Sequence, residues 1–297
     1  MEALRAYGHD VRPVHGLRGH GSVDEGVAEF DVSALEAVRA GLTGCTAVVN
    51  AAGDPDASST DLASLREANA VLPGMLARVL ADRGHGRLVH ISSAVVQGRA
   101  PVLTDSDETD AFSAYARSKI EGEQLVRSLL PGRAVVYRPP SVHAPDRRVS
   151  RSIVRLAQSP LRSVAAPASR PSPQALVQNV ASAVAFLATC DADPPEVVIH
   201  PSEGMTTGHL MSVLGGREPH VLPERLARTM VRTLERLGRR SGLVAANARR
   251  VEMMWFGQDQ DESWLSTAGW QAPVGIEGWE DLRMRITSET GPTRVQP

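Results

Sequence analysis

Lysine is almost absent from this sequence of 297 residues. Lys119 is the only one, and all the other basic residues are arginines. Cysteine is also scarce. Cys45 and Cys190 stand in apolar stretches without metal-ligand spacing, which excludes a disulfide framework and favours free thiols in a reducing compartment. We therefore expect no metal site in this protein.

Long apolar runs and a strong net charge are missing too. No segment reaches the length of about 18 apolar residues that a membrane span needs, and the N-terminus lacks the charged-then-apolar pattern of a signal peptide. A net charge of −2 gives no electrostatic reason to expect a nucleic-acid or membrane-surface partner. These absences predict a cytoplasmic protein with no nucleic-acid partner and no membrane partner.

The single lysine follows one of three tyrosines at a helical spacing. Tyr115 and Lys119 fall in a segment that is predicted to be helical through Leu130, and residues four apart share one helix face. A nearby ammonium lowers the pKa of a tyrosine, which suits a general acid/base near neutral pH. The alternative is a solvated pair on an ordinary helix.

Short apolar segments alternate with helical ones along the chain. Strands are predicted at Val11–Val14, Val27–Phe30, Ala47–Asn50, Arg87–Ile91, Ala134–Arg138 and Val197–His200. Helices are predicted at Met1–Tyr7, 33–41, 61–83 with a kink at Pro73, 113–130, 176–189 and 226–237. This alternation predicts an α/β fold with a doubly wound, Rossmann-like parallel sheet, in which ligands bind beyond the carboxyl ends of the strands.

The domain organisation is expected to follow this pattern. Residues 1–150 form a Rossmann-like domain, residues 151–287 form a smaller portion whose helices return to the core, and residues 288–297 form a flexible tail. The arginines between Arg225 and Arg240 are expected on the solvated face of a helix, with a membrane-surface role as the weaker alternative.

Several segments, in this order, resemble the extended short-chain dehydrogenase/reductase family, also called the NAD-dependent epimerase/dehydratase family. The matching segments are Asp31-Val32, Asn50-Ala51-Ala52-Gly53, Asn69, Ile91 to Gly98, Tyr115 to Lys119, Arg138-Pro139-Pro140 and Gly269-Trp270-x-x-Pro273. The resemblance implies that residues 1–150 are a dinucleotide-binding domain and that residues 151–287 mainly bind substrate. The first strand and the glycine-rich turn with which the family opens have no counterpart here, so the dinucleotide-binding domain is expected to be incomplete at its N-terminus.

The resemblance implies a role for each matching residue. Tyr115 would be the general acid/base, Lys119 would bind the nicotinamide ribose and lower the pKa of Tyr115, and Ser93 would bind the same substrate oxygen. Ser93 is preferred to Ser92 because it stands five residues before Gly98, as the family serine does. Cofactor contacts would come from Asp31, Val32, Asn50, Ala51, Ala52, Gly53, Asn69, Tyr115, Lys119, Arg138 and Pro139.

These residues also have plainer readings. Ser92 and Ser93 could simply end a strand, Asn50 could form a structural turn, and Asp31 could mark the loop after a strand. His90 is expected to be packed or hydrogen-bonded and not to be a ligand.

The family's phosphate-binding glycines have no counterpart here. Gly16, Gly19 and Gly21 do not open a regular helix. Two explanations remain open at this point: a start codon assigned too late, which we favour, or a truncated relative that binds cofactor poorly. The cofactor is NADP or NAD, with Arg12, His15 and Arg18 giving a slight preference for the 2′-phosphate of NADP.

The reaction type is narrowed by the two residues after Ser93. Dehydratases of the family carry an Asp-Glu pair there, whereas Ala94 and Val95 cannot transfer protons. The expected function is therefore an NAD(P)-dependent reductase or epimerase that acts on a hydroxyl or carbonyl of a nucleotide sugar or related small molecule. A non-catalytic relative is the alternative, and the resemblance is compatible with a homodimer packed through the helices 61–83 and 113–130.

Overall fold

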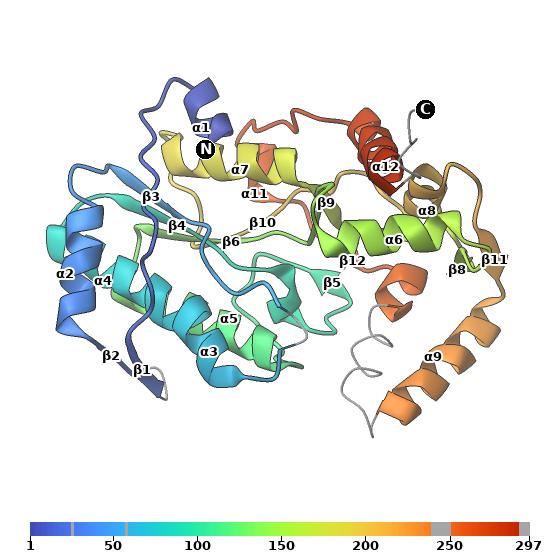
Figure 1. Cartoon of the computed structure of the whole chain (residues 1–297), viewed down its shortest axis with the longest axis horizontal. Helices are drawn as coiled ribbons and strands as arrows, with labels where there is room; N and C mark the ends of the chain where they lie inside the picture. Colours follow the sequence, from blue (N-terminus) through green and yellow to red (C-terminus); the bar gives the residue numbers. More distant parts are fainter. Residues whose placement is uncertain (25–26, 57–58, 239–250, 291–297) are drawn as a thin grey trace, which may run out of the picture. The chain divides into compact units, whose positions relative to one another are not determined.

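The computed structural model describes residues 1–24, 27–56, 59–238 and 251–290 (Figure 1). Among these residues, no helix is both long enough and apolar enough to cross a membrane. The described chain forms two compact units. The first is made from the described residues of Met1–Pro140, Val180–Pro201 and Asp261–Gln271, and the second from the described residues of Ser141–Asn179, Ser202–Gln260 and Ala272–Pro297.

The first unit is built on a parallel sheet of four strands in the order β10-β6-β4-β3. The strands are β3 (Ala47–Asn50), β4 (Arg87–Ile91), β6 (Ala134–Arg138) and β10 (Val197–Ile199). Their β-branched and apolar residues suit a sheet that is covered on both faces, and every residue of β6 is buried. These four of the six predicted strands are confirmed, as is the parallel α/β fold.

The helices of the first unit are α1 (Glu2–Ala6), which has no buried residue, α2 (Val32–Gly41), α3 (Leu62–Arg66), α4 (Leu72–Arg83), α5 (Ala114–Leu129), part of α7 (Val177–Thr189) and α11 (Trp264–Thr267). Helices α2, α4 and α5 lie on one face of the sheet and α7 lies on the other (Figure 1). Leu76 and Leu80 of α4 and Val126 of α5 pack in one core cluster with Val48 and Leu88 of the sheet. Burial of these apolar side chains is the main stabilising contribution to the unit.

The kink predicted at Pro73 takes the form of a π-helical turn. This turn, η1 (Glu67–Val71), joins α3 to α4 without an intervening loop. Proline has no N–H to donate to the carbonyl four residues earlier, so the carbonyl of Asn69 is free of that helical bond. Gly122 of α5 packs against this carbonyl, and a Cβ at Gly122 would lie only 2.0 Å from the oxygen of Asn69. A glycine is required at this helix crossing.

The N-terminal segment departs from two of the predictions. Residues 11–14 form no strand: Pro13 has no N–H to donate to a ladder. The side chain of Arg12 donates to the carbonyls of Gly41 and Thr43. The strand at Val27–Phe30 (β2) exists, but it pairs antiparallel with β1 (Gly21–Asp24) and not with the parallel sheet. Only two residues separate β1 from β2, whereas a parallel connection needs a dozen or more.

The second unit contains two short parallel strand pairs with helices around them. Strand β7 (Ser141–His143) pairs with β9 (Gln174–Leu176), and β8 (Ser163–Ala165) pairs with β11 (His220–Leu222). The remaining elements are α6 (Arg148–Gln158), α8 (Thr207–Gly215), α9 (Glu224–Gly238), β12 (Asp259–Gln260) and α12 (Ile276–Thr290). Residues 288–290 of the expected tail belong to α12, and residues 291–297 lie outside the described residues.

Helix α9 confirms the predicted helix, but Leu226 and Met230, which were expected on its apolar face, are exposed. Ala227 and Val231 are buried in a small cluster with Ala165 and Trp255. The arginines of the helix are exposed, as expected for a solvated face: they are Arg225, Arg228, Arg232 and Arg236.

Candidate functional site

The candidate residues gather at the carboxyl ends of β3, β4 and β6. The parallel register places Asn50 opposite His90, and Ile91 opposite Tyr137. The segments that follow these three strands therefore leave the sheet along one edge, which is where parallel α/β sheets bind ligands. Each of these segments carries residues that the sequence singled out.

Helix α5 presents Tyr115 and Lys119 to this edge. Ser113 caps the helix by accepting a hydrogen bond of 3.0 Å from the N–H of Ala116, which fixes its first turn. The Nζ atom of Lys119 lies 6.0 Å from the centre of the Tyr115 ring, as the four-residue spacing predicts. Lys119 is 5% exposed and donates to the carbonyl of Ile91 at the end of β4.

Burial dominates the electrostatics of Lys119. Loss of hydration lowers its pKa from 10.5 to about 8, although the negative charges of Glu123 and Asp54 act in the opposite direction. A lysine with this pKa remains mostly cationic at neutral pH. It can donate hydrogen bonds and stabilise a neighbouring phenolate.

Ser92 and Ser93 have different environments. The hydroxyl of Ser92 is buried and donates to the carboxylate of Glu123. Ser93 is half-buried and caps the short 3-10 helix η2 (Ala94–Gln97) by accepting from the N–H of Val95 at 3.3 Å. Because Ser92 is committed to Glu123, Ser93 is the better placed of the two for a ligand.

The segment after β3 is held by two asparagines. Asn50 is buried; its Nδ2 lies 3.1 Å from Nδ1 of His90, and its Oδ1 accepts from the N–H of Ala52. His90 is thus packed and hydrogen-bonded, as predicted. Burial, followed by the charge of Lys119, lowers the pKa of His90 to about 3, so its ring is neutral at physiological pH.

Asn69, in the π-helical turn, anchors the same segment from the other side. Its Oδ1 accepts from the N–H of Asp54, and its Nδ2 donates to the hydroxyl of Ser118 on α5. A Cβ at Gly53 would lie 2.7 Å from Oδ1 of Asn69 and 3.2 Å from Nζ of Lys119, so only glycine fits. Ala51, Ala52 and Gly53 are exposed. The backbone of this segment is therefore accessible, with Gly53 beside Lys119.

The other predicted cofactor contacts are engaged in structural bonds or exposed on helices. Asp31 caps α2 by accepting from the N–H of Ala34 at 2.9 Å, and its pKa is lowered mainly by the hydroxyl of Ser33. Val32 is 74% exposed in the first turn of that helix. Arg138 is fully buried and forms an ion pair of 2.7 Å with Glu123, whereas Pro139 accepts from the N–H of Ala94.

Glu123 is the residue that the sequence reasoning did not identify. It lies on α5 four residues after Lys119, contacts Ser92 and Arg138, and is 3% exposed. The signal available in the sequence was the continued four-residue spacing, Tyr115 to Lys119 to Glu123, on one helix face.

Gln97, at the end of η2, has a structural role. It is buried and exchanges two hydrogen bonds of 3.1 Å with Thr104.

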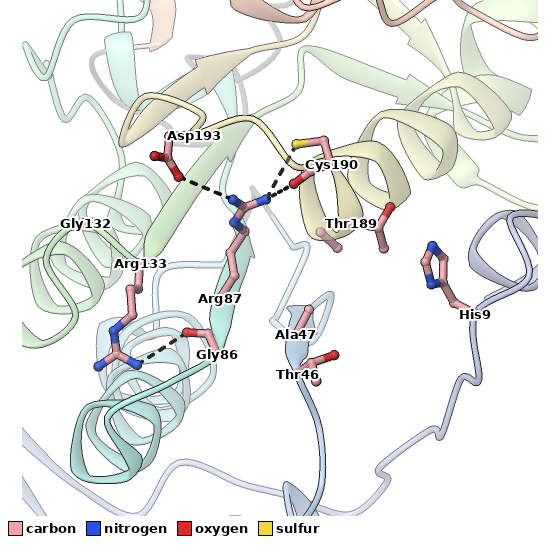
Figure 2. Close-up of a pocket in the computed structure, with 11 residues that line it drawn as sticks. His9, Thr46, Ala47, Gly86, Arg87, Gly132, Arg133, Thr189, Cys190 and Asp193 are labelled. Atoms are coloured by element: carbon pink, nitrogen blue, oxygen red, sulfur yellow. Dashed lines mark hydrogen bonds and ion pairs between the residues drawn. The ribbon is translucent and has the colours of Figure 1, made fainter.

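A cavity of about 450 Å³ lies away from these residues, at the amino ends of β3, β4 and β6 (Figure 2). Its two arginines are used for helix capping. Arg87 donates to the carbonyls of Leu187 and Cys190 at the end of α7, and Arg133 donates to the carbonyl of Leu80 near the end of α4. We therefore assign this cavity no role in the candidate site. In the part of the chain that the structure describes, no three His, Cys, Asp or Glu side chains are grouped as metal ligands.

A four-stranded parallel sheet flanked by helices, with polar residues at the carboxyl ends of its strands, defines a Rossmann-like α/β protein. A family model, described as the NAD dependent epimerase/dehydratase family, matches residues 1–200. The chain belongs to this family.

Solved structures with low sequence identity share the fold. A dTDP-4-dehydrorhamnose reductase from Bacillus anthracis in complex with NADP is 15% identical, with a TM-score of 0.57 and coverage of 86% of each chain. A UDP-glucuronic acid 4-epimerase from Bacillus cereus in complex with NAD is 17% identical, with a TM-score of 0.59 and coverage of 86% of this chain and 78% of that one. The protein MoeE5 in complex with UDP-glucuronic acid and NAD is 17% identical, with a TM-score of 0.57 and coverage of 86% and 83%. No curated protein matches the sequence.

Proposed function

We propose that the protein is an NAD(P)-dependent oxidoreductase or epimerase that acts on a hydroxyl or carbonyl group of a nucleotide sugar or related small molecule. The observation that carries this proposal is the position of Lys119, which is buried between the Tyr115 ring and the end of β4. Burial of a cation costs stability, and titratable groups that are perturbed by burial cluster at functional sites, so the retention of Lys119 beside a tyrosine supports a chemical role. Family membership and the nucleotide-sugar ligand of MoeE5 support the substrate class.

The residues present fit the nicotinamide-ribose end of a dinucleotide. The segment from Ala51 to Gly53 is exposed, and Gly53 lies beside Nζ of Lys119. A side chain at position 53 would fill the space next to this ammonium group. The pyrophosphate end is assigned no contact, because neither Gly19 nor Gly21 opens a helix: Gly19 packs on the carbonyl of Glu67 and Gly21 begins β1. Arg12, one candidate for the 2′-phosphate of NADP, already donates to backbone carbonyls. NADP and NAD therefore both remain in the proposal.

Tyr115 is the proton-transfer group in this mechanism. In the oxidative direction, its phenolate accepts the hydroxyl proton of the substrate while the carbon-bound hydrogen leaves as hydride. In the reductive direction, the phenol donates a proton to the carbonyl oxygen. Ser93 donates a hydrogen bond to the same oxygen, and Lys119 binds the ribose and stabilises the phenolate. When bound, a nicotinamide would serve as the acceptor or donor of the hydride.

Binding of NADH and NADPH to the purified chain tests this proposal. Nicotinamide fluorescence is expected to report saturable binding that is lost in Lys119→Met. Arg117→Met is the matched control, because Arg117 is an exposed cation on the same helix. Absence of binding by the wild-type chain, or equal binding by Lys119→Met, contradicts the proposal and favours the second candidate. That candidate is a non-catalytic family relative, and the placement of Gly19 and Gly21 outside a helix-opening turn favours it.

A further inference from the structure

Helix α5 contacts the end of β4 at two positions, one helical turn apart. Nζ of Lys119 donates to the carbonyl of Ile91 at 3.3 Å, and the carboxylate of Glu123 accepts from the hydroxyl of Ser92. Lys119 and Glu123 share one face of the helix because they are four residues apart. The two contacts hold the two residues that directly precede Ser93.

Arg138 holds the Glu123 carboxylate from the neighbouring strand. Its Nη2 donates to Oε2 at 2.7 Å and its Nε donates to Oε1 at 3.1 Å, with both side chains almost fully buried. Its Nη1 donates to the carbonyl of Ser106 at 2.7 Å. A bidentate arginine fixes a carboxylate in direction as well as distance. The ion pair therefore joins β4, α5 and β6 at the base of the candidate site.

We propose that Glu123, held by Arg138, is a positioning residue for the Ser93, Tyr115 and Lys119 site. Its carboxylate fixes Ser92, and with it the backbone that carries Ser93, while its charge offsets that of the buried Lys119. The part of this proposal that concerns catalysis rests on the proposed function. The part that concerns the charge of Lys119 does not.

Among the charged and titratable groups around Lys119, Glu123 does most to stabilise its positive charge. His90 on β4 is neutral, for the reason given above, and Tyr115 is the group that Lys119 serves. Two negative charges oppose the effect of burial on the pKa of Lys119, and that of Glu123 acts more strongly than that of Asp54. An oppositely charged group close to a buried one shifts its pKa by about 1 to 3 units.

The alternative is that the Glu123–Arg138 ion pair only stabilises the fold. Buried ion pairs add little net stability compared with apolar pairs of similar shape, although removal of one partner is strongly destabilising. If the Glu123–Arg138 pair had only this structural role, replacement of both residues together would leave the pKa of Lys119 unchanged. This difference separates the two explanations.

Lys119 is its own spectroscopic probe, because it is the only lysine in the chain. Expression with ¹³C-labelled lysine gives a single side-chain Cε signal, whose chemical shift reports the protonation of Lys119 without substrate or cofactor. The double variant Glu123→Gln/Arg138→Met removes both charges and avoids an unpaired buried arginine. Its Lys119 signal is expected to titrate below that of the wild type, by about 0.3 to 1 pH unit, a two- to tenfold loss of proton affinity, because the loss of the Arg138 cation offsets only part of the effect of losing the nearer Glu123 anion.

Glu121→Gln is the matched control for this titration. Glu121 is on the same helix and also accepts two hydrogen bonds from an arginine, Arg66, at 2.7 Å each. No shift is expected in this variant. An unchanged Lys119 titration in the double variant, or an equal shift in Glu121→Gln, overturns the proposal. If the chain binds no NAD(P)H, the proposed function fails, but this titration still decides whether Glu123 supports Lys119.

Discussion

The Nζ atom of Lys119 lies 6.0 Å from the centre of the Tyr115 ring and is held by the carbonyl of Ile91. The two side chains come from one helix face, and the carbonyl comes from the end of a central strand. This arrangement buries a cation at the carboxyl edge of the parallel sheet. Its cost to stability and its consequence for chemistry can be measured separately.

Lys119→Met is expected to stabilise the fold at neutral pH while it abolishes cofactor binding. The pKa of Lys119 is about 8 in the folded protein, against 10.5 ordinarily. The unfolded chain therefore binds the proton more tightly, and the folded state is penalised as long as the lysine is charged. Replacement by a neutral side chain of similar length removes this penalty, which is on the order of 1–3 kcal/mol at pH 7.

The pH dependence of this gain provides its own check. Between pH 8 and 10.5 the folded protein loses the Lys119 proton before the unfolded chain does, so the wild type gains stability and the advantage of Lys119→Met shrinks. Urea unfolding of both proteins at pH 7 and pH 10 measures the difference. A Lys119→Met protein that is less stable than the wild type at pH 7 would show that Lys119 is a structural group.

Gly122→Ala is expected to destabilise the first unit by about 1–3 kcal/mol or more, because the added methyl group overlaps a backbone oxygen. The Cβ would lie 2.0 Å from the carbonyl of Asn69, so α5 and the π-helical turn must move apart. Gln124→Ala is the control, since Gln124 is exposed on the same helix and its replacement should cost less than about 0.5 kcal/mol. Chemical denaturation measures both changes. Equal stability of the two variants would contradict the close crossing of these elements.

No sugar dehydration is expected from this protein. The two residues after Ser93 are Ala94 and Val95, which begin η2 and have no group that can take up or donate a proton. Incubation with NAD and dTDP-glucose or UDP-glucose should yield no 4-keto-6-deoxy product by NMR. A member of the family with known dehydratase activity serves as the positive control. Appearance of the keto sugar would show that another residue supplies the missing acid and base.

The central strands and the site helix could be predicted because their signals are local. Ala47–Asn50, Arg87–Ile91 and Ala134–Arg138 are short runs of apolar, β-branched residues, and burial on both faces selects such runs. The strand predicted at Val11–Val14 is wrong, because a short apolar run does not show whether a partner strand is available and Pro13 cannot donate to a ladder. The apolar pattern alone did not distinguish an irregular segment from a strand.

The contacts of the site could be predicted only in part. The Tyr115–Lys119 pair follows from helix geometry, whereas the Glu123–Arg138 pair joins a helix to a strand across 15 residues. Side chains that meet through tertiary packing leave no periodic signal. The packing of Gly122 on Asn69 was hidden for the same reason, because a glycine in a helix carries no information about its neighbour.

The most direct test of Tyr115 as the proton-transfer residue is the turnover of Tyr115→Phe. The wild-type chain is assayed with NAD and NADPH against a panel of nucleotide sugars that includes UDP-glucuronic acid and dTDP-4-dehydrorhamnose. Removal of the phenolic hydroxyl deletes the proposed acid/base, so kcat should fall by about 10²- to 10⁴-fold while the affinity for the cofactor is retained. Tyr7→Phe, at an exposed position outside the site, should retain full activity. Wild-type turnover by Tyr115→Phe would contradict the assignment of Tyr115 as the proton-transfer residue.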